Sequence, residues 1–204
     1  VLRFDDIPAG LREASQTEHR GLIAEALGFP SGDDVTPAMQ YAYSIILGSM
    51  IHDIGNLHGV FGPSAAVLST DIWAGGHGIT TVLTYEDDKR AVCSWVDLPE
   101  LWDFKETMEV YGSRERVITS FPTGFARGLP STVWVHGMDA DRTPWRKELS
   151  WHDNPFKIEL AHFGHCIRTG ETPATDGRST VHDIALVGEI VRAYLDKTEV
   201  RHGA

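Results

Sequence analysis

Residues 38–62, AMQYAYSIILGSMIHDIGNLHGVFG, form the longest strongly periodic segment of the 204-residue chain. At about 100° per residue, one broad face of a helix collects the apolar side chains of Met39, Ala42, Tyr43, Ile46, Met50, Ile54 and Leu57. Thr36 and Pro37 fit an N-cap and a first-turn proline, and the glycines from Gly59 onward end the pattern. The segment is therefore predicted to be a helix whose apolar face packs on the core.

The opposite side of this helix is partly polar and groups Tyr41, Ile45, Gly48, His52 and Asn56. Gly48 has no side chain, so a ligand has room to approach there. His52 is the candidate general base, because imidazole exchanges protons near neutral pH. Asn56, one turn further on, is a candidate donor to a substrate hydroxyl. On residue type alone, a helix histidine bonded to a neighbouring carbonyl is favoured by roughly two to one over a catalytic one.

The composition indicates an ordinary globular chain with one substantial core, since 42% of the residues are hydrophobic. The formal net charge of −11 disfavours nucleic acid and anionic membranes as partners. No apolar run reaches the ~18 residues of a membrane span, and no signal peptide is evident. Cys93 and Cys166 make no disulfide framework, which fits a reducing compartment. We expect a cytoplasmic protein.

After Gly62 the hydrophobic period changes from that of a helix to that of a strand. Seven segments have the composition and alternation of strands: 64–73, 78–86, 90–97, 104–111, 116–121, 132–138 and 145–151. Short connections between them favour antiparallel pairing. Helical patterns precede them at 11–27 and follow them at 155–170 and 179–195.

The expected architecture is therefore α+β, with an open, mostly antiparallel sheet of about six to eight strands and helices packed on one face. Residues 1–35 are expected to form an N-terminal helical segment and linker, and 36–204 the α+β domain. Gly75-Gly76-His77-Gly78 is the only glycine-rich run, and strands flank it on both sides. It is predicted to be a hairpin turn and not a phosphate loop, with His77 overhanging a groove.

Two histidine patterns suggest metal sites. His19 followed by His52-Asp53 resembles the HD-domain phosphohydrolases, a resemblance that implies bound divalent metal and an almost wholly helical fold. The strand patterns and Asn56, where a lysine commonly follows, oppose it, so it is kept as the alternative function. His162, His165 and Cys166 share one helix face, but a half-buried helix with satisfied histidines is favoured by roughly four to one. No metal site is predicted.

Three segments, in this order, resemble the C-terminal domain of the Gfo/Idh/MocA family of NAD(P)-dependent oxidoreductases. They are IHDIGNLHGVFG at 51–62, FKETMEVYGSRERV at 104–117 and ELAHFGHCIRTGETPATDGRSTVHDIALVGEIVRAY at 159–194. The resemblance implies an open antiparallel sheet whose outer face pairs with another subunit and whose helix-lined edge meets a Rossmann domain. His52 then matches the family's catalytic histidine.

The chain departs from the family in two places. Gly48 stands where an aspartate often precedes the histidine by four residues, and the Rossmann domain with its glycine motif is missing. Because the chain starts at Val1 without methionine, we expect a fragment of a longer enzyme that uses NAD or NADP. No cofactor is expected on this chain alone, which is not competent for hydride transfer.

The predicted function is the substrate-binding and oligomerisation part of a dehydrogenase acting on a sugar, cyclitol or related polyol. His52 is its acid/base group, and Asn56, Tyr41 and His77 form the wall of the substrate pocket. The expected partners are this small-molecule substrate and further copies of the chain, through the sheet face. If the chain is complete, the alternative is a binding or assembly module without catalysis.

Overall fold

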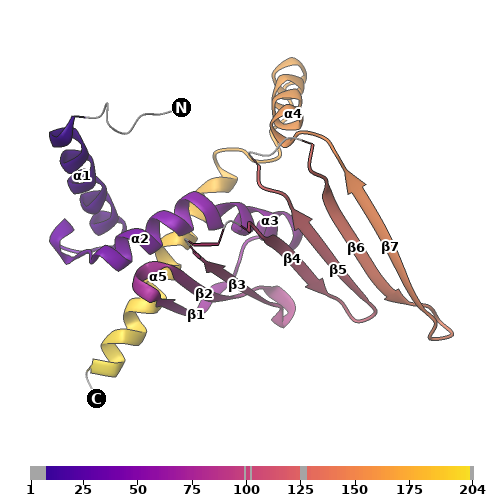
Figure 1. Cartoon of the computed structure of the whole chain (residues 1–204), viewed down its shortest axis with the longest axis horizontal. Coiled ribbons are helices and arrows are strands. Elements are labelled where there is room, and N and C mark those ends of the chain that lie inside the picture. The colour runs from indigo at the N-terminus through magenta and orange to yellow at the C-terminus, as the bar shows by residue number, and fades with distance from the viewer. Residues whose placement is uncertain (1–7, 99, 102, 125–127, 203–204) are drawn as a thin grey trace. The chain divides into compact units, whose positions relative to one another are not determined.

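The computed structural model describes residues 8–98, 100–101, 103–124 and 128–202 (Figure 1). The chain divides into two compact units, Val1–Leu98 with Gly177–Ala204, and Pro99–Asp176. Each unit contains one antiparallel sheet and at least one helix. Among the helices of the described residues, none has both the length and the apolar character needed to cross a membrane.

The first unit contains helices α1 (Ala9–Leu27), α2 (Pro37–Ile45), α3 (Ile51–Phe61) and α5 (Ser179–His202). Between α2 and α3 the backbone runs on as a π-helical segment, η3 (Ile46–Met50). Short 3₁₀ turns lie at η2 (Gly32–Asp34), η4 (Ala74–Gly76) and η5 (Glu86–Asp88). Strands β1 (Ala66–Trp73), β2 (Gly78–Thr84) and β3 (Arg90–Val96) pair in sequence order.

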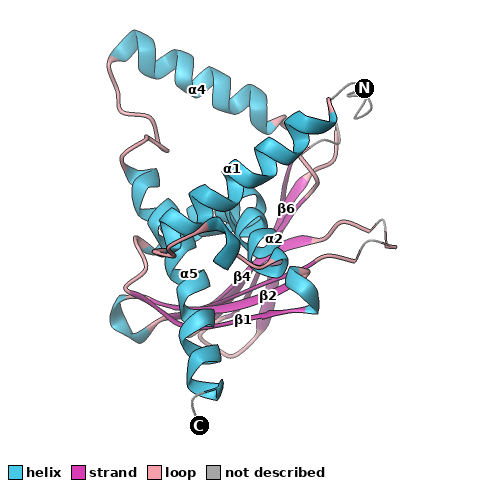
Figure 2. Cartoon of the chain, turned by 90° about the vertical axis from the view of Figure 1, so that its left-hand side faces the viewer, coloured by secondary structure: helices cyan, strands magenta, loops and turns pink. Residues whose placement is uncertain are grey.

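The core of this unit lies between the helices and one face of the three-stranded sheet. The predicted apolar face of the central helix is buried throughout, at Met39, Ala42, Tyr43, Ile46, Met50, Ile54 and Leu57. The sheet contributes Ile72, Ile79 and Leu83, together with a hydrogen-bonded pair of buried hydroxyls, Thr70 and Thr81, 3.0 Å apart. Helix α5 packs across β1 (Figure 2) and buries Val187, Ile190 and Val191. For this sheet the prediction of helices on one face is confirmed.

The second unit contains β4 (Glu106–Tyr111), β5 (Glu115–Phe121), β6 (Ser131–Met138) and β7 (Pro144–Trp151), paired in that order. Helix α4 (Pro155–Thr169) follows, with the Asn154 side chain accepting a hydrogen bond from the Lys157 amide at its N-terminus. The apolar side chains of α4 are more than half exposed, namely Phe156, Ile158, Leu160, Phe163 and Ile167. Phe156, Leu160, Phe163 and Ile167 recur at helical spacing on one side of α4, and the second unit does not bury them.

All seven expected strands are present, but the prediction of one sheet of six to eight strands is wrong. The strands form separate sheets of three and four. In the described part of the chain no pairing joins β3 to β4, and the segment between them, residues 97–105, is longer than the about two to five residues of an ordinary hairpin loop. The two antiparallel sheets also contradict the almost wholly helical fold implied by the HD-domain resemblance.

Candidate functional site

The π-helical segment η3 ends at Met50, two residues before His52. A π segment accommodates extra residues per turn, and such segments occur often at functional sites. Gly48 lies within η3, and a Cβ built on it would meet nothing within 4 Å. The surface beside Gly48 is therefore open, as we predicted from the absence of a side chain on this residue.

His52 lies in the first turn of α3, and its side chain is exposed, as is that of Asn56 one turn later. Within the part of the chain that the structure describes, neither side chain has a hydrogen-bond partner. His52 is thus not the carbonyl-bonded helix histidine that residue type alone favours. The exposed imidazole of His52 is available for exchange of a proton with a ligand.

Asp53 follows His52 in α3 and is half-buried. Burial raises the pKa of its carboxyl, and the nearby His52 opposes that effect. The Asp53 carboxylate also interacts electrostatically with Cys93 on β3. Burial first, and then the charge of Asp53, raise the pKa of the Cys93 thiol from 9.0 to about 11.

Cys93 is therefore expected to be an unreactive thiol in the folded protein. At pH 8 a pKa of about 11 leaves roughly a hundredfold less thiolate than a pKa of 9, and the thiolate is the reacting species. In a Cys166→Ser variant, the rate of reaction with a disulfide reagent should be about a hundredfold lower for folded than for guanidinium-unfolded protein. The folded rate should still rise with pH above 9. Equal rates in the two states would contradict this environment.

A second polar group lies where α2 meets the β1–β2 turn. The Tyr41 hydroxyl donates to Oδ2 of Asp97 at 2.8 Å, and Nδ1 of His77 lies 2.9 Å from the same oxygen. The rings of Tyr41 and His77 are 4.3 Å apart. These bonds, the one from Tyr41 most, lower the pKa of Asp97, while the same bond raises the pKa of Tyr41.

This geometry fixes the tautomer of His77. A carboxylate only accepts, so Nδ1 must carry the hydrogen, and Nε2 of the neutral ring is left as a proton acceptor. Such an Asp–His pair is suited to acid/base chemistry or to binding a hydroxyl. Sequence reasoning named Tyr41 and His77 but missed Asp97, which lies 56 residues from Tyr41 and follows a strand with no motif around it.

Gly76 places His77 against α2. A Cβ on Gly76 would lie 2.5 Å from the Ala38 carbonyl oxygen, and its φ of 97° is one that side chains rarely adopt. Only glycine allows the turn to approach the helix this closely. The turn therefore brings His77 beside Tyr41.

The four predicted site residues do not form one cluster. Tyr41 and His77 are in contact, whereas His52 lies eleven residues beyond Tyr41 along the helical run, roughly 16 Å at 1.5 Å per residue. His52 and Asn56 are consecutive turns of the same exposed surface. The structure therefore shows two groups from the first unit: His52 with Asn56, and Tyr41 with His77 and Asp97.

Three other histidines, His58, His162 and His165, have structural partners. Nδ1 of His58 lies 2.7 Å from Oδ1 of Asp183 on α5, a mostly buried pair that joins α3 to α5. On α4, His162 accepts from the Ala174 amide at 3.0 Å, and His165 lies 3.0 Å from Glu171. Both histidines therefore have partners as predicted, but the prediction that the helix is half-buried is wrong, because most side chains of α4 are exposed. No group of three potential metal ligands occurs among the described residues.

The sequence matches no protein-family model and no curated protein. The fold matches solved oxidoreductases. One from Desulfitobacterium hafniense, assigned as NADPH-dependent, is 17% identical with a TM-score of 0.63, over 74% of this chain and 46% of that one. An oxidoreductase from Bacillus cereus is 13% identical with a TM-score of 0.55, over 70% and 55%.

The 3-ketoreductase KijD10 from Actinomadura kijaniata, solved with NADP and TDP-benzene, is 15% identical with a TM-score of 0.55. The match covers 72% of this chain and 45% of KijD10. The chain thus corresponds to about half the length of the solved structures that it matches. At these identities the likeness establishes a shared fold.

Proposed function

We propose that the chain is the substrate-binding and oligomerisation part of an NAD(P)-dependent oxidoreductase of the Gfo/Idh/MocA type. The observation that carries this is His52, exposed, without a hydrogen-bond partner among the described residues, and next to the open surface at Gly48. It lies on the helix that precedes the sheet, in a fold shared with about half of several oxidoreductase chains.

The described residues of this chain include no phosphate loop of the kind that binds a dinucleotide. A phosphate loop needs a strand before it and a helix after it, whereas the run of glycines at Gly75 and Gly76 joins β1 to β2. The nicotinamide, which exchanges hydride with the substrate carbon, would therefore be held by another part of a longer protein. The chain described here supplies the proton transfer and contacts to the substrate.

His52 would take the proton of a substrate hydroxyl during oxidation and return it to the carbonyl oxygen during reduction. Asn56, on the same exposed side, would donate a hydrogen bond to a neighbouring hydroxyl. Tyr41 and His77, joined through Asp97, would form a second polar wall. These groups suit a polyhydroxylated substrate such as a sugar or cyclitol, and the TDP-benzene bound by KijD10 supports a sugar-like class.

Assembly of several copies is the second part of the proposal. The exposed apolar stripe on α4, from Phe156 to Ile167, favours association because monomeric proteins rarely expose such a surface. Sedimentation velocity of the full-length protein should give a homo-oligomer. If the protein is strictly monomeric, the proposal of assembly is wrong, and the proposal of catalysis by His52 is unaffected.

The full coding sequence around Val1 tests the proposal most directly. It should contain a segment of roughly 120 residues with a strand, a GxGxxG loop and a helix. The purified full-length protein should then change NAD(P)H absorbance with one or more members of a panel of sugars, cyclitols and their ketones. Absence of a dinucleotide-binding segment, or binding of neither nicotinamide by the full-length protein, would overturn the proposal.

A further inference from the structure

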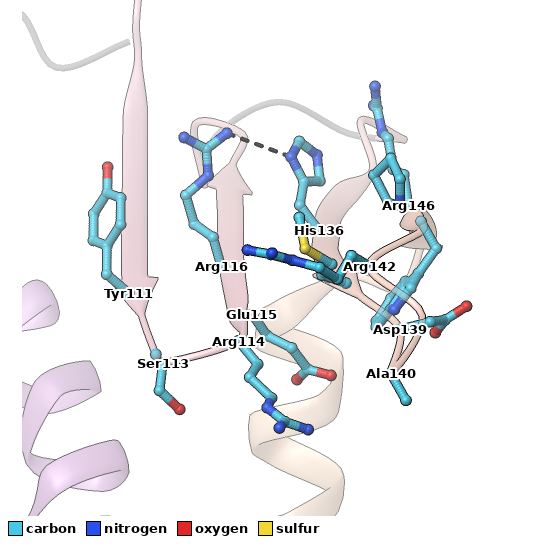
Figure 3. A pocket seen from close by; sticks show the side chains of 15 residues that line it. Tyr111, Ser113, Arg114, Glu115, Arg116, His136, Asp139, Ala140, Arg142 and Arg146 are labelled. Atoms are coloured by element: carbon cyan, nitrogen blue, oxygen red, sulfur yellow. Dashed lines mark hydrogen bonds between the residues drawn. The ribbon is translucent and has the colours of Figure 1, made fainter.

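A hollow of about 770 Å³ lies within the second unit, where two hairpins end (Figure 3). The β4–β5 turn at 112–114 lines it on one side, and the β6–β7 turn at 139–143 contributes on the other. The volume is in the range of small-molecule sites, about 300–1,000 Å³. None of its lining residues belongs to the groups described above around His52 and His77.

The strand register builds one wall of this hollow. Tyr111 pairs with Arg116, Arg116 with His136, and His136 with Arg146, so that each of the four strands contributes one side chain to a single row. Residues directly opposite in neighbouring strands have side chains on the same face of the sheet. The row therefore presents two guanidinium groups and an imidazole side by side, as Figure 3 shows.

Contacts within the row hold these groups in position. Arg116 donates to Nδ1 of His136 at 3.4 Å, and its guanidinium lies 6.0 Å from the centre of the Tyr111 ring. Arg146 lies 5.9 Å from the Trp134 ring and 3.5 Å from Glu148, an exposed ion pair. Neither contact of Arg116 neutralises its charge. The side chains of the row are therefore held in position before any ligand binds, and the row has an excess of positive charge.

The hairpin turns add two more arginines, Arg114 and Arg142. No carboxylate of the described residues lies within ion-pair distance of either guanidinium. The lining thus has four arginines against two carboxylates, Glu115 and Asp139, in a chain whose net charge is −11. A positive concave surface on an acidic protein concentrates anions and not cations.

Arg142 also has an unusual backbone. Its φ is 68°, in a hairpin turn where glycine is the ordinary residue for this conformation. The turn is closed by bonds from the Arg142 amide to the Asp139 carbonyl and from the Asp139 amide to the Thr143 carbonyl. In Figure 3 the Arg142 side chain extends from this turn toward Arg116. The fold thus retains a strained arginine whose charge is directed at the row.

We propose that this hollow binds a small molecule through a phosphate or sulfate group. Such a group offers several charged oxygens, so more than one guanidinium can donate paired hydrogen bonds to it at once. A carboxylate has only two oxygens, which a single guanidinium can occupy. Arg116 and Arg142 would hold the anion from two sides, with Arg146, Arg114 and His136 around it. The concave shape favours a small ligand over the acidic surface of another protein.

Calorimetry on the full chain tests this site with inorganic phosphate, pyrophosphate and phenyl phosphate, in phosphate-free buffer at constant ionic strength. We expect one pyrophosphate per chain, bound about tenfold or more weakly by Arg116→Gln. Lys147→Gln removes the same charge from the adjacent β7 position on the opposite face, and its affinity should stay near the wild-type value. Tighter binding of phenyl phosphate than inorganic phosphate would assign the site to an ester, and the reverse order to the free ion.

Arg142→Gly separates loss of a ligand contact from loss of folding. Glycine relieves the left-handed backbone, so the melting temperature should rise by about 2–4 °C while pyrophosphate affinity falls about tenfold. No binding at millimolar pyrophosphate, or equal weakening by Lys147→Gln, would overturn the proposal. So would a change of oligomeric state by Arg116→Gln without any binding of the probes, since the hollow would then be a contact between copies. All these readouts are independent of oxidoreductase activity.

Discussion

On the proposed function, replacing His52 by alanine is expected to lower kcat of the full-length protein by about 10²- to 10⁴-fold, the range for loss of a general acid/base group. The effect should fall on kcat more than on KM, because proton transfer matters in the transition state and not in substrate binding. The side chain is exposed on the first turn of α3, so its removal leaves no cavity in the core. Steady-state absorbance of NAD(P)H measures the change, and circular dichroism should show an unchanged fold.

His152→Ala is the matched control, because His152 is also exposed and follows β7 in the second unit. Its kcat should equal that of the wild type. In the His52→Ala enzyme the limb of the pH–rate profile that reports the base should disappear. If kcat stays within about threefold of wild type, His52 is not the base. His77, whose Nδ1 is bonded to Asp97, is then the next group to replace.

The helix and the strands were predictable because their signals are local. An apolar period of 3.6 along residues 38–62 placed Met39 and Leu57 on one face, and both are buried. Alternation likewise located seven strands. How the strands are shared between sheets depends on which strand lies next to which, and an alternating pattern carries no information on that. The division of the strands into one sheet that ends at β3 and another that begins at β4 was therefore seen only in the structure.

The contacts of the candidate site were less predictable, because they join distant parts of the sequence. Tyr41 and Asp97 of the candidate site are 56 residues apart, and the structural pair of His58 and Asp183 outside it spans 125 residues. Asp97 is an isolated carboxylate at the end of a strand, a position that is usually solvated. The π-helical segment also had no signal beyond Gly48, since its residues fit an α-helical pattern equally well. The row of Arg116, His136 and Arg146 appears only once strand register is known.

Replacing Gly76 by alanine is expected to destabilise the protein by about 4 kcal/mol, with a fall in melting temperature of about 10 °C. Two effects combine. The added Cβ would lie 2.5 Å from the Ala38 carbonyl oxygen, a backbone atom that cannot rotate away, and the φ of 97° is unfavourable for any side chain. Chemical denaturation followed by circular dichroism measures the free energy of unfolding.

Gly21→Ala is the matched control, since Gly21 lies inside α1 and a Cβ there would meet nothing within 4 Å. It should stabilise the protein by about 0.5–1 kcal/mol, because alanine restricts the unfolded chain and favours the helix. If Gly76→Ala lowers the free energy of unfolding and Gly21→Ala raises it, the close contact of Gly76 with α2 is responsible for the destabilisation. The loss of a glycine by itself is then not the cause. That contact also positions His77 beside Tyr41, so Gly76→Ala should shift the His77 ring resonances in NMR spectra. Unchanged stability and unchanged resonances would mean that the β1–β2 turn does not approach the helix this closely.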